Sequence, residues 1–537
     1  MGVKVRKRGW LHNLCRFWDI FEFNRYFRRM KRFFAFLFFG SLAFAQAPGI
    51  DWQKTIGGAN PDYLESVVKT SDGGYILGGT SSSNISGEKS ENSKGGTDFW
   101  VVKTDSQGNI NWQKTIGGEA GDSLQSITLA TDGGYLLGGT SVSGATGDKT
   151  HDNRGYSDYW VVNIDDLGNI EWDKTIGGDL ADDLFDVIQS ADGGYLVSGI
   201  SKSGISADKT ETSRGSFDNW IVKLSATGEI EWQRTIGGSN LEFFPYISAT
   251  NDGGYILGCH SMSNISGERT VATTSIEDAW VLKLDAEGQI SWQKAYPAQD
   301  FRKIKQLSDG GYILAGSAAS FWYLRTSLSY PFDSLIVKLD QNGEEVWHYR
   351  NSPVFGDCVV SDFVESGNGS IYFTTQAHGP MNLSAITKLG EDGNLIWNRH
   401  VLSLPDSNII NAIQEADDSG IIVGISSSGN IGGDKTENSR GGQDFWLVKF
   451  LPEALGINQQ QQFFGIAPNP VNNFLDIRLT NLTDAKITIY NASGQIVSQK
   501  SINTPATSVD FQYPPGFYFV NLSSSSGQNQ TVKIVKQ

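Results

Sequence analysis

The segments DGGYILGGTS (residues 72–81), DFWVVKTD (98–105) and INWQKTIGG (110–118) decide the fold of this chain. Their apolar residues alternate or run continuously, and Asp-Gly-Gly or Asp-x-x-Gly sequences bound them. Short apolar runs between such turn sequences are typical of antiparallel β-strands joined by tight hairpins. The 62 glycines and 15 tryptophans of the chain, with little helical periodicity, favour the same structure throughout.

Each of the three segments occurs seven times along the chain. The tryptophan of the third segment stands at Trp52, Trp112, Trp172, Trp232, Trp292, Trp347 and Trp397. Copies of the first segment begin at Asp72, Asp132, Asp192, Asp252, Asp309, Gly367 and Asp418, and copies of the second at Asp98, Asp158, Asp218, Asp278, Asp333, Ser384 and Asp444. This regular recurrence indicates one repeat architecture.

A further strand, of the type SVVKTSD (66–72), precedes each first segment and brings the repeat to four strands. Seven repeats of four antiparallel strands predict an all-β fold, a seven-bladed β-propeller over residues 46–450. The array begins with an isolated fourth strand at Ile50 and ends after a third strand at Phe450. The N-terminal strand is therefore predicted to complete the seventh blade and close the ring, which removes the open sheet edges.

The hairpin VVKTDSQGNINW (101–112) resembles the tryptophan-docking hairpins of the pyrroloquinoline-quinone-type propellers. The resemblance covers only this hairpin in each repeat. It implies that the repeated tryptophan packs between blades, and it implies no cofactor. The adjacent pair of cysteines found in those quinone enzymes is absent from this sequence.

Residues 1–45 are predicted to be an N-terminal extension and a signal peptide. Met30-Lys31-Arg32 is a short basic start, the run from Phe33 to Ala45 is apolar, and Ala43-Phe44-Ala45 fits a signal-peptidase site before Gln46. Cleavage is thus expected between Ala45 and Gln46. An uncleaved membrane anchor is the alternative, and both Met1 and Met30 are candidate start residues. No other segment is apolar enough to span a membrane.

The charge of the chain excludes one class of partner. The formal net charge is −16, and residues 1–45 hold ten Lys/Arg against two Asp/Glu, so the rest of the chain carries −24. Such an acidic protein is a poor ligand for phosphate backbones or anionic lipid, so nucleic acid is excluded as a partner.

After residue 450 the composition changes. Residues 451–465 include a glutamine run and are predicted to be a linker. Residues 466–537 contain alternating strands with Asn-Pro, Ser-Gly and Pro-Gly turns, which predict a small immunoglobulin-like β-sandwich. The segments APNPVNNFLDIRL, AKITIYNASGQIV and PPGFYFVNL resemble the type A C-terminal sorting domain of the type IX secretion system. The residues that carry this resemblance are Pro468, Asn469, Pro470, Gly494, Gly516, Tyr518, Lys533 and Lys536.

The resemblance implies a partner and a location. It implies Sec export through the signal peptide, recognition of residues 466–537 by the type IX machinery, and delivery to the outer cell surface or the medium. Proteins of this family are released or attached to surface lipopolysaccharide, and the sequence does not distinguish the two. The alternative for this domain is a general immunoglobulin-like adhesion module.

An acidic residue recurs in the connection between the fourth strand of one repeat and the first strand of the next. The set is Asp62, Asp122, Asp182, Glu242, Asp300, Asp357 and Asp406. A ring of carboxylates can bind Ca²⁺ or a polyhydroxyl ligand, although no DxDxDG calcium loop is present. A residue repeated in every blade is more simply explained by hydrogen bonds within the blade, so we interpret this acidic rim as structural.

Departures from the repeat are better functional candidates, because the fold does not explain them. One is the segment 317–332, with Phe321, Trp322, Tyr323, Arg325 and Tyr330, and another is the group Phe243, Phe244 and Tyr246. Exposed aromatic side chains beside an arginine suit sugar stacking or a protein partner. The equal alternative is that they fold into a local apolar core.

Catalysis has little support in the sequence. The histidines lack metal-ligand spacing, there is no GxSxG motif, and Cys259 and Cys358 lie in different repeats without a CxxC pattern, which favours free thiols. No metal site and no cofactor are predicted. The favoured function is a secreted or cell-surface binding or structural protein with a glycan or protein ligand. The alternative is an extracellular carbohydrate-active hydrolase or lyase, which would require a pair of carboxylates such as Asp300 and Asp357.

Overall fold

The computed structural model contains β-strands and no helix in the part of the chain that it describes. The described residues are 47–275, 277–319, 332–351, 357–378, 384–403, 408–453, 464–467, 471, 473–479, 485–491, 495–502, 504, 506–523 and 529–536. Within them no helix is long and apolar enough to cross a membrane. They form two compact units, which divide between Leu451 and Pro452.

The first unit consists of seven four-stranded antiparallel sheets, one for each sequence repeat. Blade 1 is β2 (Asp62–Lys69), β3 (Tyr75–Ser81), β4 (Asp98–Thr104) and β5 (Ile110–Ile116). Blade 2 is β6 (Asp122–Leu129), β7 (Tyr135–Ser141), β8 (Asp158–Ile164) and β9 (Ile170–Ile176). Blade 3 is β10 (Asp182–Gln189), β11 (Tyr195–Ser201), β12 (Asp218–Leu224) and β13 (Ile230–Ile236). Blade 4 is β14 (Glu242–Ala249), β15 (Tyr255–Ser261), β16 (Asp278–Leu284) and β17 (Ile290–Tyr296).

The remaining sheets complete the series. Blade 5 is β18 (Asp300–Gln306), β19 (Tyr312–Ala319), β20 (Phe332–Leu339) and β21 (Glu345–Asn351). Blade 6 is β22 (Asp357–Glu365), β23 (Ile371–His378), β24 (Ser384–Leu389) and β25 (Leu395–Val401). Blade 7 is β26 (Asn408–Glu415), β27 (Ile421–Ser427), β28 (Asp444–Phe450) and the N-terminal β1 (Ile50–Ile56).

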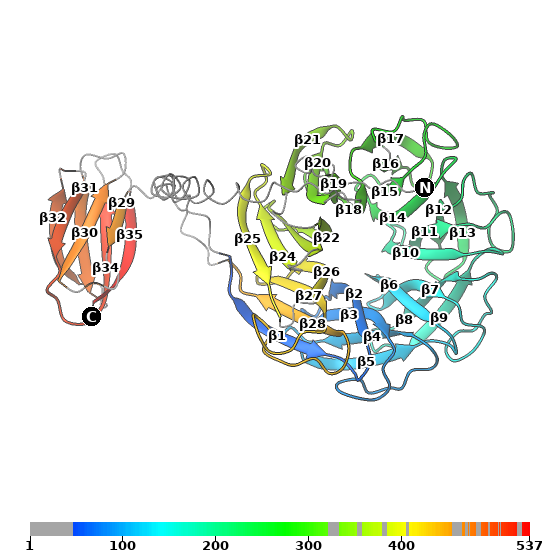
Figure 1. The fold of residues 1–537 in the computed structure, drawn as a ribbon, viewed down its shortest axis with the longest axis horizontal. Helices are drawn as coiled ribbons and strands as arrows, with labels where there is room; N and C mark the ends of the chain where they lie inside the picture. Colours follow the sequence, from blue (N-terminus) through cyan, green and yellow to red (C-terminus); the bar gives the residue numbers. More distant parts are fainter. Residues whose placement is uncertain are drawn as a thin grey trace, which may run out of the picture. The chain divides into compact units, whose positions relative to one another are not determined.

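The sheets stand around a common centre, as in a β-propeller (Figure 1). The first strands of successive blades contact one another from β2 through β6, β10, β14, β18 and β22 to β26, and β26 contacts β2 again. These seven inner strands therefore enclose the axis of the ring.

The ring closes through the N-terminal strand, as the sequence predicts. β1 pairs antiparallel with β28, from Ile50 opposite Phe450 to Ile56 opposite Phe445. In addition, Arg440 of blade 7 forms an ion pair of 2.9 Å with Glu88 of blade 1. The strand pair joins residues about 400 positions apart, and the ion pair joins residues 352 positions apart, so both connect the last blade to the first part of the ring.

The repeated tryptophan packs between blades because the next hairpin has no side chain at the contact. Trp112 lies against Gly168 in the turn of blade 2, and a Cβ atom placed on that glycine would stand 2.8 Å from the indole ring. Gly168 has a φ of 82°, which favours glycine. The indole nitrogen of Trp112 also donates a hydrogen bond to the carbonyl of Asp166 at 3.0 Å. The docking role predicted for this tryptophan is thus confirmed.

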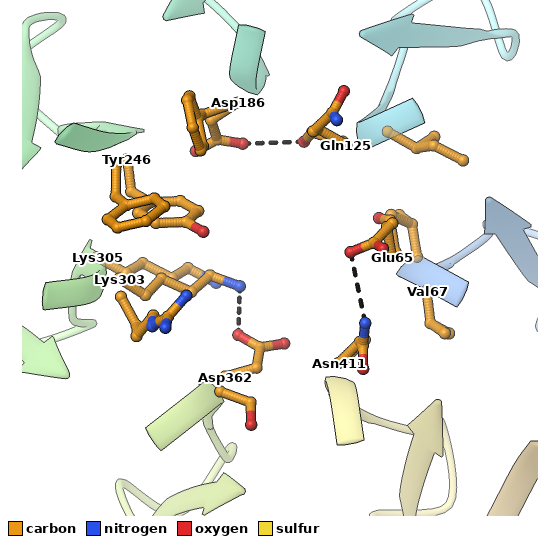
Figure 2. Close-up of a pocket in the computed structure, with 18 of the residues that line it drawn as sticks. Glu65, Val67, Gln125, Asp186, Tyr246, Lys303, Lys305, Asp362 and Asn411 are labelled. Atoms are coloured by element: carbon orange, nitrogen blue, oxygen red, sulfur yellow. Dashed lines mark hydrogen bonds and ion pairs between the residues drawn. The ribbon is translucent and has the colours of Figure 1, made fainter. Parts of the chain in front are cut away.

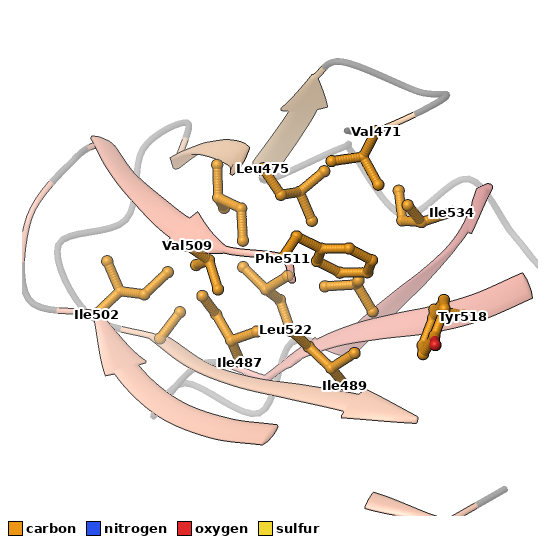
Figure 3. Close-up of a cluster of buried hydrophobic side chains, with 13 residues drawn as sticks. Val471, Leu475, Ile487, Ile489, Ile502, Val509, Phe511, Tyr518, Leu522 and Ile534 are labelled. Atoms are coloured by element: carbon orange, nitrogen blue, oxygen red, sulfur yellow. The ribbon is translucent and has the colours of Figure 1, made fainter. Parts of the chain in front are cut away.

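The second unit contains two sheets. One has three strands, β29 (Phe464–Ala467), β30 (Phe474–Leu479) and β33 (Ala506–Asp510). The other has four strands, β31 (Ala485–Asn491), β32 (Ile496–Ile502), β34 (Gly516–Ser523) and β35 (Asn529–Lys536). Figure 3 shows that Leu475 and Val509 from the first sheet share one buried core with Ile487, Ile489 and Leu522 from the second. The unit is therefore a small two-sheet β-sandwich.

Candidate functional site

A cavity of about 510 Å³ lies at the centre of the propeller. All seven inner strands contribute to its wall, between residues 65 and 68 of β2 at one end of the series and residues 409 and 414 of β26 at the other. Its volume is typical of sites for small molecules. We refer to it as the central cavity.

A β-bulge recurs in the inner strands and shapes the wall of the central cavity. In β2 the register with β3 shifts between Leu64 and Ser66, so that Glu65 is the extra, unpaired residue. The equivalent residues are Gln125 in β6, Phe185 in β10, Phe244 with Pro245 in β14, Arg302 in β18, Ser361 in β22 and Asn411 in β26. All of these except Pro245 line the central cavity. The bulge thus directs one additional side chain per blade to the cavity wall.

The residue before each bulge and the bulge residue itself differ in how strongly the repeat constrains them. Leu64, Leu124 and Leu184 precede the bulge and are fully or almost fully buried. The bulge residues themselves are acidic, amide, aromatic, basic or hydroxylic in different blades. The fold therefore fixes the position of this side chain but not its chemistry, which leaves the position open for function.

One side of the central cavity is basic. Its described lining contains three basic residues, and all of them lie on β18: Arg302, Lys303 and Lys305. Arg302 forms an ion pair of 3.0 Å with Asp300, and its guanidinium lies 5.2 Å from the ring centre of Phe244. Lys303 forms an ion pair with Asp362, and this carboxylate raises the pKa of Lys303 against the opposing effect of burial.

Lys305 differs from its two neighbours on β18. It is exposed to the cavity, and among the described residues its ammonium group has no hydrogen-bond or ion-pair partner. Burial, together with the nearby charge of Lys303, lowers the pKa of Lys305.

Tyr246 lies on the same side of the cavity, as Figure 2 shows. Burial raises the pKa of Tyr246 to about 12, so its hydroxyl group stays protonated and can donate a hydrogen bond.

The opposite side of the central cavity carries acceptors (Figure 2). Glu65 is exposed to the cavity yet enclosed by its walls, and this desolvation raises the pKa of its carboxyl group to about 7. Asn411 donates from its amide nitrogen to the carbonyl of Leu64 at 2.6 Å and, more weakly, to Glu65 at 3.4 Å. The amide oxygen of Asn411 is buried and has no hydrogen-bond partner.

Two further carboxylates in the wall hold blades together. Asp186 accepts hydrogen bonds from Ser126 of blade 2 at 2.9 Å and from the amide of Ile247 of blade 4 at 3.2 Å. Asp362 accepts one from the amide of Ile413 in blade 7 at 3.0 Å, besides its ion pair. Desolvation raises the pKa of Asp186 to about 6. These donors occupy both carboxylates, so Glu65 is the wall carboxylate with the fewest partners.

The acidic rim lies inside the blades. Asp62, Asp122, Asp182 and Glu242 begin their strands and are fully buried. Asp62, for example, accepts hydrogen bonds from the Gly58 amide at 2.6 Å and from the Ser81 hydroxyl at 2.5 Å. The other three accept the equivalent amide hydrogen bond, and burial raises the pKa of all four. These contacts tie each inner strand to the connection that precedes it.

The last three members of the acidic rim are placed differently. Asp300 is half-buried and binds Arg302. Asp357 begins β22, and the structure describes only its backbone. Asp406 lies outside the described residues. The pair Asp300 and Asp357 therefore stays a prediction.

The predicted aromatic groups divide between described and undescribed parts of the chain. Phe321, Trp322, Tyr323, Arg325 and Tyr330 lie outside the described residues. Phe243, Phe244 and Tyr246 belong to β14 itself and are half-buried, between the exposed surface and the local core that the sequence left open. Phe244 and Tyr246 line the central cavity, and Phe244 contacts the ring of Phe185 edge to face at 5.4 Å. Phe243 packs against Phe217.

The remaining predicted residues belong to the termini. Ala45, Gln46, Pro468, Asn469, Pro470 and Gly494 lie outside the described residues. Gly516 and Tyr518 lie on β34, and the buried Tyr518 donates a hydrogen bond to the carbonyl of Pro514 at 2.9 Å. Lys533 and Lys536 lie on β35, opposite Phe519 and Gly516. Cys259 and Cys358 are free and buried.

The described residues contain no group of three His, Cys, Asp or Glu side chains that could hold a metal ion.

The three basic residues of β18 were missed by the sequence interpretation, although a signal for them exists. DFRKIKQ (300–306) carries three basic residues where DYLESVVK (62–69) has one, at its last position, and DDLFDVIQ (182–189) has none. Comparing the inner strands position by position would have found it.

Comparison with known proteins identifies the second unit. Residues 465–537 match the family described as the secretion system C-terminal sorting domain. No curated protein matches the chain. Such a domain implies interaction with the type IX machinery and export to the cell surface or secretion.

Solved structures similar to the chain include BBS1N, a WD40 domain and PorZ. BBS1N, in its complex with ARL6DN, is 9% identical, with 76% of this chain and 97% of that chain covered and a TM-score of 0.41. The Pan2 WD40 domain of Neurospora crassa is 14% identical, with 60% and 91% covered and a TM-score of 0.33. PorZ, a surface component of the type-IX secretion system of Porphyromonas gingivalis, is 10% identical, with 91% and 100% covered and a TM-score of 0.18. Residues 465–537 of this chain thus belong to the secretion system C-terminal sorting domains, and a β-propeller precedes them.

Proposed function

We infer that this is a secreted or cell-surface binding protein and that its propeller binds a glycan in the central cavity. The observation that carries this proposal is the lining of the cavity. It combines the aromatic rings of Phe185, Phe244 and Tyr246 with the polar groups of Glu65 and Asn411. Aromatic faces beside hydrogen-bonding side chains suit a sugar ring, which is apolar on its faces and hydroxylated at its edge.

The size and polarity of the central cavity favour a sugar over a protein ligand. A volume of about 510 Å³ lies within the range of cavities that enclose a small molecule, about 300–1,000 Å³. A stable protein partner would instead require a contact surface of about 800 Å² on each side, which a cavity enclosed by seven strands does not offer. The glycan is therefore the ligand that we propose.

The alternative, a carbohydrate-active hydrolase or lyase, has less support. A glycosidase requires two carboxyl groups free to act as acid and as base or nucleophile. In the described cavity wall Asp186 and Asp362 are occupied by donors from neighbouring blades, which leaves Glu65 without a free second carboxylate. This arrangement favours binding without cleavage.

A cavity-filling substitution tests the proposal. Ser66 is a half-buried residue of the cavity wall, and Ser66→Trp would fill much of the central cavity. We expect the exported protein to bind members of a glycan array and the Ser66→Trp variant to lose that binding, with a melting curve that shows an intact ring. Ser106→Trp, in an exposed turn, is the matched control. Binding that survives Ser66→Trp, or no glycan binding by the parent protein, would contradict the proposal.

The export route that we propose is Sec passage through the signal peptide followed by type IX secretion. Deletion of residues 465–537 removes the sorting domain and leaves the separate propeller unit whole. We expect the shortened protein to fold and to accumulate in the periplasm, as measured by cell fractionation. Normal amounts of it at the surface or in the medium would contradict this route.

A further inference from the structure

The basic groups of the central cavity are confined to one strand. Arg302, Lys303 and Lys305 on β18 are the three basic residues of the described lining, and the other six inner strands contribute none. Two of the three charges are already compensated, because Arg302 binds Asp300 and Lys303 binds Asp362. The ammonium group of Lys305 is the one positive charge in this wall that lacks a described partner.

Two neighbouring features make this ammonium group suitable for an anion. Tyr246 points into the cavity from the same side (Figure 2), and its hydroxyl group has no hydrogen-bond partner among the described residues. Lys305 and Tyr246 together offer a charge and a neutral O–H donor, which is the combination that a carboxylate accepts well. Burial and the nearby charge of Lys303 lower the pKa of Lys305, and a bound anion would oppose both effects.

The opposite wall favours hydrogen-bond donors on the ligand and disfavours a second negative charge on it. Glu65 carries a carboxyl group there, and the buried amide oxygen of Asn411 has no hydrogen-bond partner. The orientation of the Asn411 amide is fixed because its nitrogen donates to Leu64. A buried acceptor without a partner is satisfied by a hydroxyl group of a ligand. A second negative charge on the ligand would instead meet Glu65 and be repelled.

From these two walls we propose that the central cavity selects a hexuronate, a sugar that carries one carboxylate. Its carboxylate binds Lys305 and Tyr246, and its hydroxyl groups donate to Glu65 and Asn411. This inference rests on the glycan-binding function proposed above and specifies the class of sugar. The strongly acidic remainder of the chain, −24 over residues 46–537, gives no general attraction for anions, so selection depends on the local charge of β18.

Isothermal titration of the full exported protein tests this proposal with four probes: glucuronate, galacturonate, glucose and inorganic phosphate. We expect at least one uronate to bind at least tenfold more tightly than glucose and phosphate. Lys305→Met should remove this preference, and Lys305→Arg should retain most of it. Because Lys305 has no described partner, neither variant should change the melting temperature. Lys54→Met, on β1 outside the cavity lining and likewise without a described hydrogen-bond or ion-pair partner, is the matched control.

Tyr246→Phe is a second, independent variant, since it removes only the hydroxyl group and keeps the ring, and it should lower the ratio of uronate affinity to glucose affinity. Equal binding of glucose and uronate, or a preference that survives Lys305→Met, would overturn the hexuronate proposal and leave glycan binding intact. Phosphate that binds as tightly as the uronates would overturn it as well, because the site would then be a general anion site. If no saccharide binds to the parent protein, both proposals fail.

Discussion

Blades 1 to 4 and blade 7 keep the repeat sequence, whereas blades 5 and 6 depart from it. In blade 1 the buried Trp100 lies beneath the buried ammonium group of Lys89, at 5.0 Å from the ring centre. Blades 3, 4 and 7 repeat this arrangement with Lys209, Arg269 and Lys435. Leu335 and Ile386 take the place of the tryptophan in blades 5 and 6. In the regular blades the repeated polar residues thus form contacts within the blade. The ammonium group of Lys305, which has no described hydrogen-bond or ion-pair partner, lies in a divergent blade.

Ion pairs between neighbouring loops follow the same division. Arg440 binds Glu88, Lys94 binds Asp148, Arg154 binds Asp208 and Arg214 binds Glu268, so that each loop is joined to the loop of the next regular blade. At the next position of this series, blade 4 has Thr274 in place of a basic residue. The comparison teaches that repeated side chains report on stability, and that candidates for function are better sought at single positions that vary between blades, such as the bulge residues of the inner strands.

Removal of β1 should have the largest effect, because it breaks the closure on which all blades depend. Deletion of residues 50–58 exposes the edge of β28 and removes Trp52, which packs against the turn at Gly108. We expect loss of cooperative unfolding, with aggregation through the open edge. Thermal melting and size-exclusion chromatography measure this. A deletion variant that melts like its parent would show that the ring does not need β1.

Truncation of a regular blade's tryptophan should have the next largest effect. Trp160 is fully buried, packs on Phe99 at 4.9 Å and donates a hydrogen bond to Asp173 at 2.9 Å. Trp160→Ala should lower the free energy of unfolding by about 3–5 kcal/mol, measured by urea denaturation. The Lys305→Met variant of the divergent blade serves as its contrast, with an expected change near zero. Similar losses for both would contradict the distinction between repeated structural side chains and the unique cavity side chain Lys305.

The fully buried and the half-buried residues of the acidic rim should differ in their contribution to folding stability, which is a smaller effect. Asp182→Ala leaves the Gly178 amide and the Ser203 hydroxyl without their buried acceptor. Unsatisfied groups of this kind cost about 1–3 kcal/mol of folding stability. Asp300→Ala removes only a half-buried ion pair with Arg302, and we expect a loss of about 0.2–1 kcal/mol. Urea denaturation of both variants checks the order, and a larger loss for Asp300→Ala would reverse it.

The repeat made most of the fold predictable. Strand positions, ring closure and tryptophan docking follow from local patterns that recur seven times. An ambiguous strand assignment in one repeat is therefore resolved by comparison with the other copies. The β-bulges were not predictable in the same way, because an extra residue such as Glu65 changes register without changing the alternation that its neighbours show. Phe244 illustrates the consequence. Its sequence context leaves open an exposed recognition residue or a local core, and the two-residue bulge of β14 places it in the cavity wall.

The candidate site was less predictable than the fold, since it combines single residues from seven strands. Lys305 and Glu65 are 240 positions apart, and each is an ordinary charged residue in its own strand. Only the closed ring places them across one cavity. A prediction based on repeated residues selects the acidic rim, which the blades use for hydrogen bonds, and passes over residues that occur once.

Glu65 should give the smallest effect, a change in the pH dependence of stability. Enclosure by the cavity walls raises the pKa of Glu65 from its ordinary value of 4.5 to about 7. Between these values the folded protein binds more protons at this site than the unfolded chain does, so the free energy of unfolding falls as the pH rises from 4.5 to 7. Exposure of the side chain to the cavity limits the size of this contribution.

Glu65→Gln removes the titrating group and keeps an amide of similar shape in the cavity wall. Relative to its parent, the variant should therefore gain stability as the pH rises toward 7 and keep that gain above it. Asp186, whose pKa lies at about 6, contributes a slope of the same sign in both proteins, so the difference between the two isolates Glu65. Urea denaturation at several pH values from 4.5 to 8 measures it, and Glu119→Gln, on an exposed connection, controls for loss of a surface charge. If parent and variant show parallel curves, Glu65 titrates as a surface carboxylate and the cavity wall around it is open to bulk water.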